Sequence, residues 1–146
     1  MDKPQANQLA SAQQLIADTP FAHWLGAQVT EEGSDVLIHV PFNEMLVGNS
    51  RIRAIHGGIM ASILEIAAAA TLVAHDPAAA RLRPISMQTN FLKSTKDTDT
   101  WARGIIRKIG RRIDTIEAIA WQLDPQKPVA IAVCDFARTE VKDKSQ

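Results

Sequence analysis

The sequence predicts an α+β fold in which an antiparallel β-sheet wraps around one long central helix. Residues 55–75 form an apolar stretch that opens with a His and two glycines and carries one carboxylate, Glu65, near its middle. A helix that is apolar on every side is buried or lies in a membrane. Four segments with alternating apolar side chains follow it and are typical of strands. These segments are 83–93, 100–109, 113–123 and 127–139. Because they succeed one another directly, we expect a meander that curls around the helix.

Insertion into a membrane is the alternative for this helix. The stretch 57–74 approaches the ~18 residues that identify a spanning helix. Glu65 would then lie near the middle of the bilayer, at a cost of about 3 kcal/mol. The stretch is also rich in alanine rather than leucine, and the sequence has no second span. We therefore predict a buried core helix and no membrane partner.

The segments upstream of the helix predict an N-terminal helical segment, over residues 1–25, and a hairpin. A weak helical stripe covers 7–17, and Pro20 can begin a second short helix. Two strands, 26–31 and 35–42, are joined by a turn that contains Gly33.

Two polar segments complete the chain. Residues 43–55 are expected to form a loop that leads into the central helix. The polar residues 140–146 are expected to form a flexible tail.

Length, charge and cysteine content restrict the class of protein. A chain of 146 residues predicts one domain, over residues 1–146. Sixteen basic and 16 acidic residues give a net charge of zero, so no overall field favours nucleic acid. The single cysteine, Cys134, excludes an internal disulfide, and its apolar neighbours indicate a core residue. The N-terminus does not resemble a signal peptide, so we expect a cytoplasmic protein.

Neither a metal site nor a nucleotide phosphate loop is expected. The four histidines have no ligand spacing among themselves, and no phosphate loop of the nucleotide-hydrolase type is present. These histidines are His23, His39, His56 and His75.

The start of the central helix is a candidate site for an anion or a developing oxyanion. A helix that begins at Gly57 or Gly58 presents unpaired N–H groups and the positive end of its dipole. Glu65 lies nine residues after His56, or about 13 Å along the axis. One small substrate centre cannot contact both groups of one helix.

This spacing predicts a two-fold homodimer with composite sites, provided that both groups are catalytic. Glu65 would then come from a second copy whose helix runs antiparallel to the first. The alternative is that Glu65 is a structural acid paired with an arginine and that the glycines only permit tight packing. We favour the catalytic interpretation, because an unpaired buried carboxylate is costly to keep.

Three motifs together resemble the hotdog-fold acyl-CoA thioesterases of the PaaI-like, phenylacetate-pathway type. They are HGGIMASILE at 56–65, NFLKST at 90–95 and KIGRRI at 108–113. The resemblance extends from about Trp24 to Arg138, and an acid seven residues after the second glycine makes the first motif fairly specific. It implies a hotdog fold and hydrolysis of an acyl-CoA, with coenzyme A as part of the substrate and no separate cofactor.

The resemblance also implies catalytic roles. The Gly57 N–H would polarise the thioester carbonyl, Glu65 of the partner subunit would act as general base or nucleophile, and His56 would order the loop and help to fix the carbonyl or the water. The family usually places Asn or Gln six residues before the His, where this chain has Ser50. Either Ser50 or the neighbouring Asn49 substitutes, or the activity is weak.

Two basic segments are implied to bind coenzyme A. Lys and Arg beside backbone N–H groups suit phosphates, whereas each segment taken alone is a solvated turn. The implied binding residues are Gly58, Phe91, Leu92, Lys93, Ser94, Thr95, Lys96, Lys108, Gly110, Arg111 and Arg112. Arg51 and Arg53 can bind an acyl carboxylate or a phosphate, or have a structural role.

Two other functions remain open: a hotdog hydro-lyase that acts on enoyl thioesters, and a non-catalytic acyl-CoA binding module. The apolar residues on both faces of several strands favour a covered outer face, and hence a dimer of dimers, a homotetramer.

Overall fold

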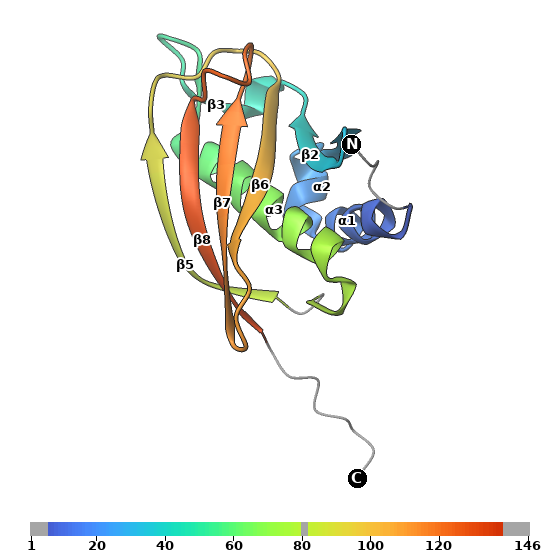
Figure 1. Ribbon diagram of the computed structural model, residues 1–146. Helices are drawn as coiled ribbons and strands as arrows, with labels where there is room; N and C mark the ends of the chain where they lie inside the picture. The colour runs from blue at the N-terminus through green and yellow to red at the C-terminus, as the bar shows by residue number, and fades with distance from the viewer. Residues whose placement is uncertain (1–5, 80–81, 139–146) are drawn as a thin grey trace.

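The computed structural model describes residues 6–79 and 82–138; the predicted tail, 140–146, lies outside them. An antiparallel sheet curves around one long helix, α3, and two short helices lie on the other side of α3 (Figure 1). The helices are α1 (Ala6–Asp18), α2 (Pro20–Trp24) and α3 (Gly57–His75), with 3₁₀ turns at Glu44–Leu46 and Pro77–Ala79. The strands are β1 (Gln28–Glu32), β2 (Asp35–Val40), β3 (Val47–Asn49), β4 (Ala54–Ile55), β5 (Leu82–Phe91), β6 (Thr100–Lys108), β7 (Ile113–Trp121) and β8 (Ala130–Arg138).

The predicted α+β architecture is confirmed, but the expected meander is wrong in one connection. The strand order is β1-β2-β6-β7-β8-β5, with every pair antiparallel. Strand β5 therefore pairs with β8 at one edge and not with its successor β6. A long connection, residues 92–99, joins β5 to β6, whereas adjacent strands usually need only a short turn. The predicted loop 43–55 also contains a small sheet of β3 and β4.

Small side chains bring α3 close to the sheet. The inner face of the sheet presents alanines that are at most 1% exposed, and α3 presents Ala67, Ala68 and Ala70. These sheet alanines are Ala102, Ala118, Ala120, Ala130 and Ala132. At Gly104 the helix comes so near that an added Cβ would lie 2.6 Å from Thr71 Oγ1. The same hydroxyl accepts the Gly104 N–H at 3.1 Å, which fastens α3 to β6.

The central helix has the composition of a membrane span but is a core element of this fold. Its most apolar window has a mean hydropathy of 1.8, and 56% of that window is buried inside the protein. Core helices of soluble proteins have the same length and composition. The expected buried helix is confirmed. Cys134 is also a core residue and is 1% exposed. Its burial, and to a smaller extent the negative charges of Glu65 and Asp135, raise the pKa of its thiol to about 11.

Strand β5 forms an edge whose inner face is not covered by its own chain. Met87 pairs with Cys134 and Phe91 with Ala130, so both side chains point to the helix side of the sheet. They are nevertheless 38% and 58% exposed. A ten-residue edge strand with exposed apolar side chains is a surface for pairing with another chain.

Candidate active site

His56 caps α3 and leaves the Gly57 N–H free at the start of the helix. The His56 Nδ1 accepts the Gly58 N–H at 2.9 Å, so the ring of the neutral residue carries its proton on Nε2. Among the described residues, no acceptor binds the Gly57 N–H. This N–H group lies at the positive end of the helix dipole, where an anionic oxygen is stabilised.

The small sheet of β3 and β4 holds His56 in place. The His56 N–H donates to the Leu46 carbonyl at 2.8 Å. Gly48 lies directly against the histidine, because an added Cβ would be 2.6 Å from His56 Cα. Sequence reasoning missed Gly48, since a glycine in a segment without strand periodicity does not indicate what packs against it.

A cavity of about 380 Å³ opens at the start of α3. It brings together Gly57 and four of the residues that the resemblance implies for coenzyme A, namely Phe91, Lys93, Ser94 and Thr95. The Phe91 ring lies closest, since a Cβ on Gly57 would be 3.4 Å from its Cζ. The Thr95 side chain is buried and its Oγ1 accepts the Ile55 N–H at 2.8 Å, so this residue anchors the loop.

Gln122 fixes the loop 92–99 beside this cavity. Its Oε1 accepts the Lys96 N–H at 2.8 Å, and its Nε2 donates to the Lys96 carbonyl at 2.9 Å. A neighbouring cavity of about 230 Å³ is lined by Lys93, Lys96 and Lys127, together with Asp124. A cavity lined by three lysines suits phosphate groups. Lys127 was not predicted, because it lies in a turn remote from the other two lysines in sequence.

The second predicted binding segment lies at the opposite end of the sheet. Lys108 is the last residue of β6, and Gly110, Arg111 and Arg112 lie in the β6–β7 turn. The nine residues of β6 separate this turn from loop 92–99 by about 30 Å (Figure 1). In this turn the Gly110 N–H donates to Asp114 Oδ1 at 2.9 Å. One chain therefore does not bring the two implied segments together.

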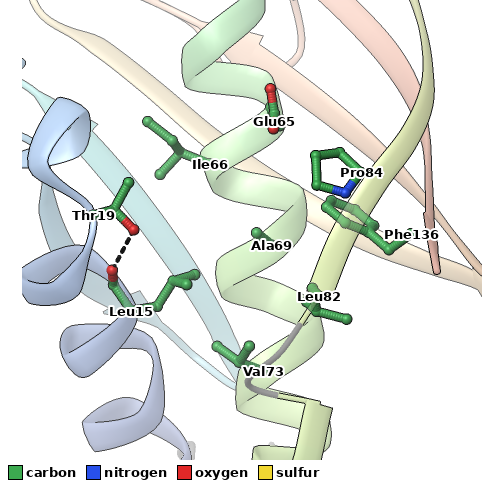
Figure 2. Close-up of a pocket in the computed structure, with 9 residues that line it drawn as sticks. All are labelled: Leu15, Thr19, Glu65, Ile66, Ala69, Val73, Leu82, Pro84 and Phe136. Atoms are coloured by element: carbon green, nitrogen blue, oxygen red, sulfur yellow. Dashed lines mark hydrogen bonds between the residues drawn. The ribbon is translucent and has the colours of Figure 1, made fainter. Parts of the chain in front are cut away.

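Glu65 lies at the centre of α3 without a partner of opposite charge. Its side chain is half-buried and, among the described residues, the carboxylate makes no hydrogen bond or ion pair. It lines a further cavity, between α1, α3 and the sheet (Figure 2). It lies eight positions after Gly57, or about 12 Å along the helix. An arginine-paired Glu65 finds no support in the described residues.

The loop before His56 shows where the remaining candidates lie. Asn49 Oδ1 accepts the Arg51 N–H at 3.1 Å, and Ser50 is exposed in the following turn. Arg53 forms ion pairs with Glu44 and Asp97, which raise the pKa of its guanidinium. Its backbone has a positive φ of 52°. Two carboxylates thus neutralise Arg53, which favours the structural role considered for it.

Comparisons with known proteins agree with this architecture. The family model for the acyl-CoA thioesterase N-terminal domain matches residues 47–137. A search of curated proteins found no match.

Solved structures with the same fold come from the thioesterase superfamily. An X-ray structure of a thioesterase-superfamily protein has a TM-score of 0.83 at 23% identity, covering 90% of this chain and 98% of that one. The E. coli PaaI protein of the phenylacetic acid degradation operon has a TM-score of 0.77 at 15% identity, with 94% and 97% covered. A mutant of the phenylacetic acid degradation protein PaaI from Thermus thermophilus has a TM-score of 0.70 at 17% identity, with 83% and 100% covered. Because the family match spans more than half of the chain, this protein belongs to the acyl-CoA thioesterase family and has the hotdog fold.

Proposed function

We propose that this protein hydrolyses acyl-CoA thioesters to the free acid and coenzyme A, at sites composed of two subunits. One observation carries the proposal: the unengaged Gly57 N–H opens onto a cavity with Phe91 and Lys93, while the unpaired Glu65 lies about 12 Å further along the same helix. A second copy with an antiparallel α3 would bring its own Glu65 to the first copy's Gly57.

The chemistry follows from these groups. Glu65 takes a proton from water, and the water oxygen bonds to the thioester carbon. The carbonyl electron pair moves onto oxygen, where the Gly57 N–H and the His56 Nε2–H donate to it. Collapse of the tetrahedral intermediate breaks the C–S bond. The thiolate leaves with the proton that Glu65 had taken up, so the carboxylate is ready for the next substrate.

The exposed inner face of β5 supports the dimer. Phe91 lies against Gly57 at the start of α3, and both Met87 and Phe91 are open to solvent in one chain. Pairing of two β5 edges would cover them and satisfy the free backbone groups of the edge. The same arrangement would bring the partner's β6–β7 turn toward the first copy's loop 92–99, so that both basic segments could contact one coenzyme A.

Assembly into a homotetramer is a further part of the proposal. On the outer face of the sheet, Ile113 and Val133 are 42% and 44% exposed. Apolar side chains on this face favour a second contact between dimers.

Light scattering coupled to size-exclusion chromatography measures the mass of the assembly. A monomer that still cleaves thioesters would contradict the composite site.

Release of free thiol from acyl-CoA by the wild type and by Glu65→Gln tests the proposed activity. Loss of a general base lowers kcat by about 10²–10⁴-fold. Glu32→Gln is the matched control, because it makes the same change on exposed β1. Equal rates in the wild type and Glu65→Gln, with both variants folded, would remove Glu65 from the chemistry.

A non-catalytic acyl-CoA binding module is the second candidate. It is favoured by Ser50, a short side chain in an exposed turn where the resembling enzymes usually place Asn or Gln. Calorimetric binding of an acyl-CoA without any release of thiol would support this function and contradict hydrolysis.

A further inference from the structure

The cavity beside Glu65 is built from both the central helix and the N-terminal helices. It has a volume of about 270 Å³ and lies between α1, α3 and the ends of β5 and β8. Figure 2 shows Glu65, Ala69 and Val73 in succession along α3, with Leu15 on α1 on one side and Phe136 on the other. Residues four apart lie on the same face of a helix, so this stripe forms one wall.

The interior of this cavity is apolar beyond the carboxylate. Glu65 is the only titratable side chain among the described residues that line it. Thr19 also lines it, but its hydroxyl donates to the Leu15 carbonyl at 2.6 Å (Figure 2). Transfer of an apolar group from water into this cavity is therefore favourable, whereas a second carboxylate would be repelled by Glu65 with no cation to balance the two charges.

The size of the cavity restricts its occupant. An apolar cavity of about 150 Å³ holds a benzene molecule, so 270 Å³ suits a phenylacetyl or a medium-length alkyl group. A second cavity, of about 230 Å³, lies beyond it, and Leu15 and Val73 line both. These two side chains thus form the wall that ends the first cavity.

We propose that this cavity holds the acyl group of the substrate, that the group is uncharged and apolar, and that Leu15 of α1 sets its maximum length. The proposal rests on the proposed hydrolysis, since the thioester carbon must lie at Glu65 for the acyl group to extend toward Val73. Leu15 lies outside the segment 47–137 that matches the thioesterase family. The length limit of this chain would therefore depend on a residue of its N-terminal helix in addition to the family domain, which supplies the rest of the cavity.

Two variants change the cavity in opposite directions. Ala69→Leu fills it beside Glu65, and Leu15→Ala opens it into the second cavity. For octanoyl-CoA we expect Ala69→Leu to lower kcat/KM at least about tenfold, with a much smaller effect on acetyl-CoA. Leu15→Ala should raise the ratio of kcat/KM for dodecanoyl-CoA over octanoyl-CoA by about tenfold. Gln13→Ala, an exposed change on the same helix as Leu15, should leave both ratios unchanged.

The substrate panel separates the possible acyl classes. The kcat/KM for phenylacetyl-CoA should change as that for octanoyl-CoA does between the wild type and Ala69→Leu. Succinyl-CoA should be a poor substrate of all variants. Preference for succinyl-CoA, or equal changes for every chain length, would overturn the proposal while leaving hydrolysis intact.

A binding measurement separates failure of the cavity from failure of the reaction. S-octyl-coenzyme A and S-ethyl-coenzyme A are thioethers that cannot be hydrolysed, and calorimetry measures their Kd. If no variant cleaves thioesters but Ala69→Leu weakens only the S-octyl ligand, the cavity assignment stands and the proposed hydrolysis fails. If S-octyl-coenzyme A binds no tighter than S-ethyl-coenzyme A, or Ala69→Leu weakens both alike, the cavity does not hold the acyl group.

Discussion

At the scale of single residues, the proposed mechanism gives the two ring nitrogens of His56 different roles. Nδ1 accepts the Gly58 N–H and caps α3. Nε2 consequently carries the proton and can donate to a substrate oxygen. The cap stabilises the helix start, and only the proposed donation from Nε2 concerns the reaction, so a suitable substitution can separate the two roles.

Asparagine in place of His56 should keep the cap and lose the donor. Asn is a good N-cap residue, whereas Ala costs about 1 kcal/mol. Urea unfolding should thus show a stability near the wild type for His56→Asn and a lower one for His56→Ala. Thiol release should fall in both. Full activity in His56→Asn would show that Nε2–H takes no part.

Gly48 positions the same histidine through close packing. A methyl group there would overlap with His56 Cα and Cβ. Gly48→Ala should therefore lower stability by about 1–3 kcal/mol, as overpacking does, and lower kcat by displacing His56. Ser34→Ala, an exposed change in the β1–β2 turn, is the control. Gly33→Ala is unsuitable as a control because Gly33 has a φ of 61°, which strains a residue with a side chain. An unchanged kcat in Gly48→Ala would show that His56 does not depend on this contact.

At the scale of elements, the connection 92–99 is held by hydrogen bonds to other elements rather than by secondary structure of its own. Gln122, at the end of β7, bonds both backbone groups of Lys96 and also the Thr98 carbonyl, at 3.3 Å. Thr95 bonds to Ile55 at the end of β4. The loop with Lys93 and Lys96 is thus preformed next to the start of α3, which lowers the entropic cost of binding a ligand there.

Leucine at Gln122 tests this restraint. It removes the hydrogen bonds to Lys96 and leaves a buried polar group unpaired, at a cost of about 1–3 kcal/mol. We expect a higher KM for acyl-CoA, with kcat much less affected, because the loop must be ordered on binding. Gln126→Leu, an exposed change in the same β7–β8 connection, is the control. Equal KM values for the two variants would contradict a role for Gln122 in binding.

At the scale of the whole molecule, carboxylates tie distant elements together and make stability depend on pH. Hydrogen bonds lower the pKa of four of them. Asp76 accepts from Arg138, and Asp97 accepts from Arg53. For Asp99 the main cause is the Phe42 N–H and the next is His39; for Asp135 the main cause is the Thr115 hydroxyl and the next is that of Ser86. The folded state thus binds their protons less tightly than the unfolded chain does. Their stabilisation is present above the unfolded pKa of about 4 and is lost as the pH falls through the folded values.

Urea unfolding at neutral pH and below about pH 4 should therefore show a marked loss of stability in acid. Asp76→Asn removes one of the four groups, so the variant should be less stable at neutral pH and should lose less on acidification. A stability that stays constant down to about pH 3 would contradict the depressed pKa values.

Complementation between two inactive variants tests the composite sites directly. Glu65→Gln and His56→Ala each damage a different half of every site. After subunit exchange between equal amounts, about a quarter of the sites would combine an intact Glu65 with an intact His56 from the other copy. Activity should recover toward that level in the mixture. No recovery, with exchange verified by mass spectrometry of tagged chains, would place both residues of a site in one subunit.

The sequence by itself determined the elements and the start of the site. Apolar periodicity indicated the central helix and all six strands of the main sheet, because the side chains that an element buries recur with its own period along the sequence. The His-Gly-Gly start of α3 and the lone carboxylate of Glu65 were equally local, and the distance between them followed from helix geometry.

Only the tertiary structure decided which elements meet. Alternation along a strand reports which face is buried but not which strand pairs with it, so the β5–β8 pair was missed. For the same reason the sequence did not predict the contact of Gly48 with His56, the hydrogen bonds of Gln122 to the loop 92–99, or the cavity that Leu15 and Glu65 both line. These contacts join residues remote in sequence, and their partners are chosen by the packing of the whole chain.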